Sequence, residues 1–318
     1  MLSIQTIHLT KTFGSLTAVK NLDLEVKPGE IFGLVGPDAS GKTTTLRMLC
    51  GILSPDGGEA RVAGYDIQKE TESLKEKVGY LPQRFGLYRD LTVLENIHFY
   101  GDLYQVPRQE RKIRIERLLQ FANLEPFGKR KARDLSGGMK QKLGLICALI
   151  HTPQILFLDE PTTGVDPLSR RDFWTILYDL LKEGVTILFS TSYLDEAERC
   201  SRVGLIFQGE LLIADTPSAL KSRIGGTILE LRVEDHQKGM RLLEDINLIR
   251  SLVLSGDKIH ILVDDPQKGE EVIREVLKEQ GLEILDLLVV RPSLEDVFVS
   301  IVRERNLQSL LSAGGGKV

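Results

Sequence analysis

This chain of 318 residues has few cysteines, little tryptophan and a small net charge: three cysteines, one tryptophan and a formal net charge of -4. Cys50, Cys147 and Cys200 lie far apart in the sequence. They predict neither a disulfide framework nor a metal site, and they are typical of structural thiols in a reducing compartment. Because basic residues are not in excess, the composition does not point to nucleic acid as a partner.

Secretory and membrane-spanning segments are not predicted either. The chain opens Met1-Leu2-Ser3, without a basic region followed by an apolar stretch. The longest apolar runs, such as residues 143–150, fall well short of the ~20 residues that cross a bilayer. We therefore expect a cytoplasmic protein whose role at a membrane would depend on a separate chain.

What remains is the composition of a soluble globular protein, with 42% hydrophobic and 27% charged residues. The length fits roughly two domains. Residues 31–35 and 155–158 form continuous apolar runs, as expected of strands buried on both faces. Residues 185–189 predict a third strand, and residues 43–53 have helical spacing. Strands that alternate with helices predict an α/β core with a parallel sheet. Residues 84–152 are mostly helical in pattern and predict a helical subdomain.

A second pattern begins after residues 223–227, where Arg-Ile-Gly-Gly-Thr interrupts the first. We predict the order βαββαβ, the ferredoxin-like arrangement, over residues 228–234, 236–246, 249–254, 258–264, 267–280 and 282–290. A last helix is expected over residues 293–305, with Ser293 as its cap. The predicted domains are residues 1–222, a small α+β accessory domain at 223–306, and a disordered tail at 307–318.

A glycine-containing loop lies between the run at 31–35 and the helix after it. The loop matches the phosphate-binding pattern G-x-x-x-x-G-K-[ST] through Gly36, Pro37, Asp38, Ala39, Ser40, Gly41, Lys42 and Thr43, followed by Thr44. Backbone N–H groups of such a loop and the positive end of the helix dipole attract phosphate. Lys42 adds a charge for the β- and γ-phosphates, and Thr43 offers a hydroxyl to Mg²⁺. A chance glycine turn is the alternative, and the strand–loop–helix context argues against it.

Two carboxylates, Asp159 and Glu160, follow the apolar run at 155–158. Open α/β sheets bind ligands at the carboxyl ends of their strands. Asp159 would hold Mg²⁺ through its water shell, and Glu160 would polarise the water that attacks the γ-phosphate. Such a pair alone is more often part of a solvated loop, but the phosphate loop upstream favours the functional interpretation.

Between these motifs stands Leu-Ser-Gly-Gly-Met-Lys-Gln at residues 135–141, which resembles the signature sequence of ATP-binding-cassette (ABC) proteins. The resemblance covers about residues 2–222. It implies a P-loop NTPase core, ATP and Mg²⁺ as ligands, and ATP hydrolysis. In that family the segment of Ser136, Gly137 and Gly138 contacts the γ-phosphate of ATP held by the opposite subunit, so that two subunits enclose two ATP molecules. A capped helix after a turn is the local alternative.

Three further residues follow the order of the family's motifs. Phe13 resembles the aromatic residue that stacks on adenine, and a buried core phenylalanine is the alternative. Gln83 resembles the glutamine that reaches Mg²⁺ and the attacking water; the alternative is an ordinary loop residue. Asp166 resembles the acid of the loop that bridges the two subunits, although it could equally be a turn acid before Pro167.

The chain departs from the family where a histidine usually follows the third strand. Here the sequence is Ser190-Thr191-Ser192, and all five histidines lie outside this segment. Because serine is shorter and cannot carry a positive charge, we expect slow hydrolysis at this site. A different cassette could supply a competent site, or Ser192 could act through a bridging water. Where the family favours Asn-Gly in the phosphate loop, this chain has Asp38 and Ala39.

Pro-Ser-Leu-Glu-Asp-Val-Phe at residues 292–298 resembles the terminal segment of drug and ABC-2-type exporter ATPases, and an ordinary amphipathic helix is the alternative. The resemblance implies an exporter ATPase on the inner face of the cell membrane, with a separate transmembrane permease and a second cassette as partners. Two other functions compete with this one. The first is a soluble ATPase that acts on the ribosome or on DNA, and the second is an ATP-dependent clamp that does not hydrolyse ATP. The accessory domain could support a dimer or bind a regulator.

Overall fold

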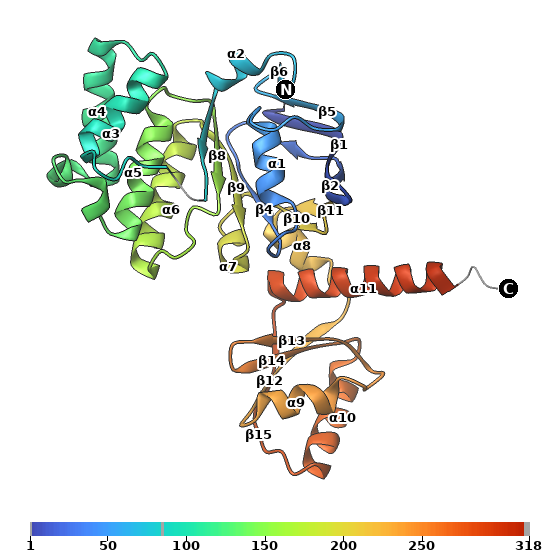
Figure 1. The fold of residues 1–318 in the computed structure, drawn as a ribbon. Helices are drawn as coiled ribbons and strands as arrows, with labels where there is room; N and C mark the ends of the chain where they lie inside the picture. Colours follow the sequence, from blue (N-terminus) through green and yellow to red (C-terminus); the bar gives the residue numbers. More distant parts are fainter. Residues whose placement is uncertain (1, 84–85, 315–318) are drawn as a thin grey trace. The chain divides into compact units, whose positions relative to one another are not determined.

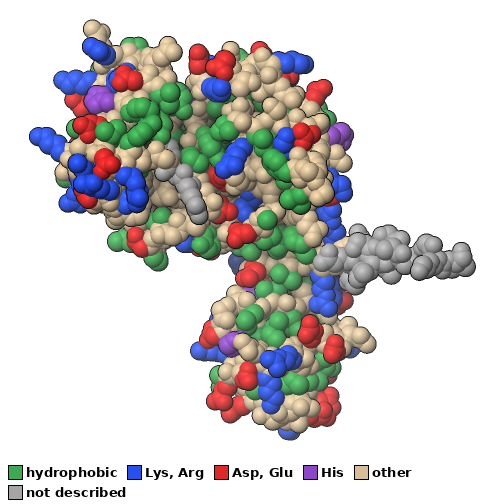
Figure 2. All heavy atoms as spheres, in the orientation of Figure 1, with side chains coloured by type: hydrophobic (Ala, Val, Ile, Leu, Met, Phe, Trp, Pro, Cys, Tyr) green, Lys and Arg blue, Asp and Glu red, His purple; other side chains and the backbone are tan. Residues whose placement is uncertain are grey.

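The computed structural model describes the backbone of residues 2–83 and 86–314, and the side chains of these residues up to 305 (Figure 1). The chain forms two compact units, Met1–Ile213 and Ala214–Val318. On the face drawn in Figure 2, acidic and basic side chains are interspersed over both units. None of the helices in the described part of the chain combines the length and apolar character needed to cross a membrane.

The centre of the first unit is a six-stranded sheet of order β11-β10-β4-β9-β8-β7, in which the pairs β10–β4, β4–β9, β9–β8 and β8–β7 are parallel. Its strands are β4 (Ile31–Val35), β7 (Val78–Leu81), β8 (Ile155–Asp159), β9 (Thr186–Thr191), β10 (Arg202–Phe207) and β11 (Glu210–Asp215). Every residue of β4, β8 and β9 is buried, which explains the continuous apolar runs at residues 31–35 and 155–158. The predicted parallel α/β core is confirmed.

A second sheet in this unit was not predicted. It has the order β2-β1-β5-β6, with β3 also paired to β1, and its pairs are antiparallel. Its strands are β1 (Ile4–Phe13), β2 (Leu16–Leu22), β3 (Glu25–Val26), β5 (Gly57–Val62) and β6 (Tyr65–Asp66). Helix α1 (Lys42–Leu49) contacts strands of both sheets, so the phosphate-loop helix lies between two layers.

The helices α3 (Val93–Leu103), α4 (Arg108–Ala122) and α5 (Gly137–Leu149) occupy the stretch that was predicted to be helical, and they gather beside the sheet (Figure 1). Thr92 and Glu95 form a capping box that fixes the start of α3. The remaining elements of this unit are α2 (Thr71–Lys75), α6 (Pro167–Lys182), α7 (Leu194–Ala197) and two 3₁₀ turns, η1 (Glu125–Phe127) and η2 (Ala132–Asp134).

The second unit contains an antiparallel sheet of order β13-β14-β12-β15. In chain order its elements are α8 (Pro217–Ser222), β12 (Thr227–Val233), α9 (His236–Leu243), β13 (Ile249–Ser255), β14 (Lys258–Val263), α10 (Pro266–Glu279), β15 (Ile284–Val290) and α11 (Leu294–Gly314). From β12 to β15 this is the predicted ferredoxin-like βαββαβ arrangement. One face of the sheet packs on α9 and α10 through buried residues such as Leu231, Ile261 and Ile273.

Two of the predicted boundaries differ from the structure. The second unit begins at Ala214 rather than 223, because α8 contacts α11 and buries Leu220. The glycines at 225 and 226 therefore lie within this unit, in the short segment between α8 and β12. The tail predicted as disordered from 307 continues α11 to Gly314, consistent with the helix-forming leucine, glutamine and alanine of that stretch; residues 315–318 lie outside the described part.

A buried polar cluster connects α11 to the sheet of its own unit. His260 faces Asp296 through Nδ1 at 3.0 Å and Glu230 through Nε2 at 3.2 Å. The Ser293 backbone N–H and hydroxyl also donate to Asp296. Only an imidazolium donates from both ring nitrogens, and the hydrogen bond to Asp296 raises the pKa of His260 above its ordinary value. The cluster therefore holds a charged histidine between two carboxylates.

Replacing Asp296 with alanine should lower the free energy of unfolding of the second unit by about 3 kcal/mol, because His260 would lose the carboxylate that faces it in a buried position. Hydrogen exchange of peptides from β12 and β14 measures this change. Asp257→Ala is the matched control, since its ion pair with Arg232 is exposed and contributes less than about 1 kcal/mol. Equal effects of the two substitutions would contradict the conclusion that Asp296 stabilises a charged His260.

The same cluster predicts that the stability of the second unit depends on pH. A histidine with a raised pKa in the folded state stabilises the fold fully below its unfolded pKa of about 6.5. This contribution is lost as pH rises through the raised folded pKa of His260. Protection of β14 against hydrogen exchange, corrected for the intrinsic rate, should therefore fall on the alkaline side of about pH 6.5, and His260→Gln should flatten that dependence.

Candidate functional site

A cleft of about 610 Å³ lies in the first unit at the carboxyl ends of the parallel strands. It brings together the following residues from the phosphate loop, β1, β2 and three later loops: Phe13, Leu16, Ala18, Asp38, Ala39, Ser40, Gly41, Lys42, Thr43, Thr44, Gln83, Glu160, Thr163, Ser192 and Tyr193. Most of the residues predicted for a nucleotide site thus share one cavity.

The phosphate loop is closely packed against the rest of the unit. A Cβ on Gly36 would lie 2.1 Å from the carbonyl oxygen of Ile206, and one on Gly41 would lie 2.4 Å from that of Ala18. Gly41 also has φ 104, a conformation that other residues rarely adopt. The two glycines therefore allow the loop to turn tightly before α1 and to leave its N–H groups at the cleft.

Ala39 has φ 60, in the left-handed region. Its strain costs about 1–2 kcal/mol. Ala39→Gly should therefore raise the free energy of unfolding of the first unit by about 0.5–1 kcal/mol, after the extra chain entropy of glycine is subtracted. Denaturant unfolding followed by Trp174 fluorescence measures it. Ala148→Gly, in a regular helix, should have the opposite sign; destabilisation by both substitutions would contradict the prediction.

Lys42 is buried at the start of α1, and its ammonium group folds back over the loop. Nζ donates to the carbonyl oxygens of Gly36 at 2.8 Å and Pro37 at 2.9 Å, and lies 3.2 Å from Glu160 Oε1. Gly36 and Pro37 thus contribute backbone oxygens although they do not line the cleft. The lysine charge lies between the phosphate loop and the carboxylate at the end of β8.

Asp159 is held at the end of β8 by donors on both of its oxygens. Thr43 Oγ1 and Ser190 Oγ each donate to Oδ1 at 2.9 Å, and Tyr80 donates to Oδ2 at 3.2 Å. Burial raises the pKa of Tyr80 well above its ordinary value, so its hydroxyl remains a donor at neutral pH. Three hydroxyl groups therefore orient one buried carboxylate.

Glu160 has an unusual backbone conformation and well-defined partners. Its φ is 46, and its N–H donates to the backbone oxygen and to the hydroxyl of Ser190. Gln83 Nε2 donates to Oε2 at 2.9 Å, while Lys42 faces Oε1. A non-glycine residue with positive φ is strained and is typical of functional sites. Here that conformation places the carboxylate beside both Lys42 and Gln83.

The donor set fits a nucleotide phosphate with a divalent cation. The loop N–H groups and Lys42 are the donors that phosphate needs. The buried Ser40 hydroxyl has no hydrogen-bond partner among the described residues. Thr43 and Asp159 offer oxygen ligands of the kind that Mg²⁺ prefers. Within the described part, no group of three or more His, Cys, Asp or Glu residues could hold a metal, so a cation at Asp159 would also need phosphate oxygens or water.

Phe13 is 49% exposed at the end of β1 and lies beside the cleft, so the alternative of a buried core phenylalanine is wrong. Leu16, 66% exposed, lines the same cavity from β2. Together they give the cleft an apolar side of the kind that a base could stack on.

Ser136, Gly137, Gly138 and Asp166 are not among the described residues that line the cleft. Ser136 caps α5, and Asp166 caps α6 through the N–H of Ser169. A Cβ on Gly138 would lie 2.5 Å from Ser169 Cβ, so the signature segment packs on the start of α6. Within one chain, Ser136 therefore acts as a helix cap and Asp166 as a capping acid at a turn, as the local alternatives predicted. Neither role prevents contacts of these residues with a second chain.

Sequence reasoning missed Tyr80, Ser190, Thr163 and Tyr193. Thr163 Oγ1 lies 3.4 Å from Glu160 Oε2, and the Tyr193 ring lies 4.8 Å from the Arg170 guanidinium carbon. Ser190 is one of three hydroxyl residues in β9, with Thr186 and Thr191, and the sequence does not distinguish it from them; Tyr80 is the one hydroxyl residue of β7.

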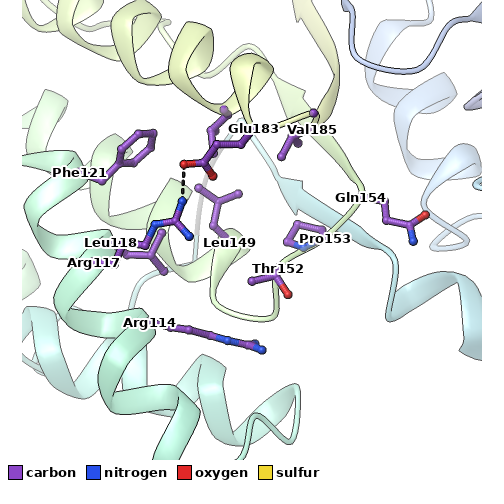
Figure 3. Close-up of a pocket in the computed structure, with 12 residues that line it drawn as sticks. Arg114, Arg117, Leu118, Phe121, Leu149, Thr152, Pro153, Gln154, Glu183 and Val185 are labelled. Atoms are coloured by element: carbon purple, nitrogen blue, oxygen red, sulfur yellow. Dashed lines mark hydrogen bonds and ion pairs between the residues drawn. The ribbon is translucent and has the colours of Figure 1, made fainter.

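A second, more apolar cavity of about 410 Å³ lies between α4, the end of α6 and the loop before β8, and contains none of the predicted site residues (Figure 3). Arg117 and Glu183 form an ion pair across it. The lysine, the carboxylates and the phosphate loop all belong to the larger, polar cleft rather than to this cavity. Together these groups define a P-loop nucleotide-binding protein.

Comparison with known proteins narrows that class. A model of the ABC transporter family matches residues 19–163, and a model of the C-terminal domain of DrrA1-3-like ATP-binding proteins matches residues 216–302. The linearmycin resistance ATP-binding protein LnrL of Bacillus subtilis is 35% identical over 308 residues, covering 94% of this chain and 97% of that protein. The daunorubicin resistance ATP-binding protein DrrA2 of Streptomyces coeruleorubidus is 33% identical over 302 residues, which cover 93% of this chain and 94% of that protein. The chain belongs to the family of ABC transporter ATP-binding proteins.

A probable multidrug ABC transporter ATP-binding protein of Escherichia coli, YbhF, is 42% identical over 288 residues, which cover 90% of this chain but 49% of that protein; the chain spans about half of its length. Among solved structures, an ATP-binding subunit of an ABC transporter has a TM-score of 0.64 at 26% identity, covering 71% of this chain and 94% of its own. A dimeric ATP-binding cassette with ADP and Pi, MJ0796, has a TM-score of 0.61 at 28% identity, covering 67% of this chain and 98% of its own.

Proposed function

We propose that this chain binds ATP with Mg²⁺ in the cleft and hydrolyses it as the motor subunit of an exporter. The observation that carries the proposal is the joint placement of Lys42, Glu160 and Gln83 around the phosphate loop. Lys42 and the loop amides would bind the phosphates, Phe13 would stack on adenine, and Thr43, Asp159 and Gln83 would hold Mg²⁺. When bound, Mg²⁺ would neutralise charge on the phosphate oxygens.

Glu160 is proposed as the general base, accepting a proton from the attacking water while Gln83 orients that water. In the structure Glu160 is paired with Lys42. A phosphate group would compete for the same ammonium, and that competition would release the carboxylate for the water. The ion pair is therefore a resting arrangement that nucleotide would exchange.

A second cassette would complete the site. Ser136, Gly137 and Gly138 open the 13-residue helix α5, and the positive end of its dipole is suited to an anion. Because these residues do not line the cleft of their own chain, we propose that they face the γ-phosphate in a partner's cleft, with the segment that ends at Asp166 bridging the two chains. ATP would then drive dimerisation.

Export through a separate transmembrane permease is proposed from the relatives, whose names refer to multidrug transport, resistance to linearmycin and daunorubicin, and Nod factor export. The DrrA-like C-terminal domain supports the same assignment. The chain would then work at the inner face of the cell membrane.

Ser192 favours a second candidate, a cassette that dimerises around ATP but scarcely hydrolyses it. Serine lines the cleft where the family has a histidine, and it supplies no charge to the phosphates.

Light scattering and phosphate release from the purified chain test these proposals. The motor proposal predicts a monomer without nucleotide, a dimer with ATP, and Mg²⁺-dependent phosphate release. Lys42→Ala should abolish the ATP-dependent dimer and the phosphate release. A dimer without phosphate release would favour the second candidate. If ATP caused neither dimerisation nor phosphate release, both would be contradicted. Co-isolation with a multi-span protein from solubilised membranes tests the permease partnership, and recovery from the soluble fraction alone would contradict it.

A further inference from the structure

The sheet of the second unit ends in β15, an edge strand that is apolar and largely exposed. It pairs with β12 on one side, and no other strand in the described part of the chain pairs with its outer edge. Leu285, Leu288 and Val289 on this strand are 52%, 51% and 65% exposed. An open edge presents backbone N–H and C=O groups to any strand that can pair with them, and apolar side chains along it favour such pairing.

The opposite edge of the same sheet is protected in the ways that proteins ordinarily use. Its edge strand β13 carries Arg250, which forms ion pairs with Asp264 and Glu304, and α11 packs against this strand. Along β15, by contrast, Asp286 is the one charged residue, and the strand contains no proline. Charges, prolines and covering helices are what keep an edge from pairing with another chain. The β15 edge therefore has the character of an interaction surface.

The hydrogen bonds of β15 show which of its backbone groups face the open edge. The N–H of Leu287 donates to the neighbouring side chain, at Asp286 Oδ1, at 3.0 Å. Backbone groups of an antiparallel strand alternate between its two sides. The groups of Leu287 and Val289 thus face outward, and those of Asp286 and Leu288 face β12. Because an exposed carboxylate holds the central outward N–H, the carbonyl oxygen of an incoming strand can take its place.

The sequence of β15 is suited to antiparallel pairing with itself. With Leu287 opposite Leu287 of a second copy, Leu285 lies opposite Val289 and Asp286 lies opposite Leu288. The apolar side chains then meet one another across the pair, and the two carboxylates are not directly opposed. Centring the pair on Asp286 instead would set carboxylate against carboxylate, which is destabilising. The charge pattern therefore selects the register centred on Leu287.

We propose that β15 pairs with β15 of a second copy of this chain about a two-fold axis at Leu287, and that this pairing adds to the ATP-dependent dimer. The inference rests on the dimer in the proposed function. A single pair of seven-residue strands is small beside the about 1,200 Å² that stable interfaces bury, so it does not hold two free chains together. Once ATP joins the first units, the second units are at a high local concentration, and the strands pair.

Cysteine cross-linking tests this register in the full chain. Residues 286 and 288 of opposite copies would have Cα atoms about 4.5 Å apart, within the range that a disulfide spans. In either single variant the nearest engineered cysteines are diagonal neighbours about 7–8 Å apart, beyond that range. A mixture of Asp286→Cys and Leu288→Cys chains, oxidised with Mg²⁺ and a non-hydrolysable ATP analogue, should therefore give at least about 10-fold more disulfide-linked dimer than either variant alone. The native cysteines are buried, so the unaltered chain should give none.

Light scattering of the same samples separates this inference from the proposed function. If the nucleotide-dependent dimer forms but the mixture gives no more disulfide than the single variants, pairing of β15 with itself is overturned and the proposed function stands. The open edge would then be left for a strand of a different protein. If no nucleotide-dependent dimer forms, the proposed function and this inference are both contradicted.

A lysine on the open edge tests what the pairing contributes. Val289→Lys puts a charge at an exposed position opposite an apolar residue of the second copy, as protected edge strands do. It should raise the protein concentration for half-maximal dimerisation with the ATP analogue about 10-fold. Leu254→Lys, 40% exposed on the opposite edge strand, is the matched control and should leave that concentration unchanged. With both variants folded by circular dichroism, no change in Val289→Lys, or an equal increase in Leu254→Lys, overturns the proposal.

Discussion

Glu160→Gln should lower the single-turnover rate of ATP hydrolysis about 10²–10⁴-fold, because glutamine cannot accept the proton of the attacking water. Glutamine keeps the shape of the side chain and can still contact Gln83. Nucleotide binding should therefore survive, and the ATP-bound dimer should accumulate. The measurement is phosphate release with the protein in excess over ATP, so that only the site's own chemistry is followed.

Glu183→Gln is the matched control, since this glutamate lies at the end of α6, outside the described lining of the cleft. It should leave the single-turnover rate unchanged. If Glu160→Gln hydrolysed ATP within twofold of the unaltered chain, Glu160 would not be the base, and the proposed chemistry would need another residue.

Ser192→His should raise steady-state ATP turnover about 10²–10³-fold, by analogy with the effect of one preorganised hydrogen-bond donor at a reacting centre. Ser192 lines the cleft with Lys42 and Glu160, so a ring at this position could reach the phosphates. Steady-state phosphate release by the purified variant measures the effect.

Ser192→Ala separates the two explanations of the natural serine. If serine acts through a bridging water, alanine should slow turnover further; if a different cassette supplies the competent site, alanine should change nothing. Unchanged turnover in Ser192→His would contradict the expectation that this site is slow because it lacks a histidine.

The core strands and the phosphate loop could be predicted because their signals are local. Residues 31–35 and 155–158 form strands because each is a short, entirely apolar run, and Lys42 and Thr43 follow the first of these within one tight turn. The ends of parallel strands share an edge, which explains why Asp159 and Glu160 lie near that loop. The exposed Phe13 was found only through its resemblance to the family.

The contacts of Asp159 could not be predicted because they depend on strand register. Asp159 meets Ser190 since these two residues are partners in the pairing of β8 with β9, and Tyr80 reaches Asp159 from β7 on the other side of β8. A hydroxyl in a strand gives no indication of which carboxylate it will face. The antiparallel sheet escaped prediction for a similar reason, since β1 and β5 lie far apart in the sequence and pair only in the folded chain.

Every function proposed for this chain depends on whether the loop that follows β4 binds a nucleoside triphosphate. Isothermal titration of the purified chain with a non-hydrolysable ATP analogue and Mg²⁺ tests this. Saturable binding that is lost in Lys42→Ala and kept in Lys20→Ala, a lysine on β2 outside the described lining of the cleft, is the predicted result. No detectable binding by the unaltered, folded chain would contradict the site and every function proposed for it.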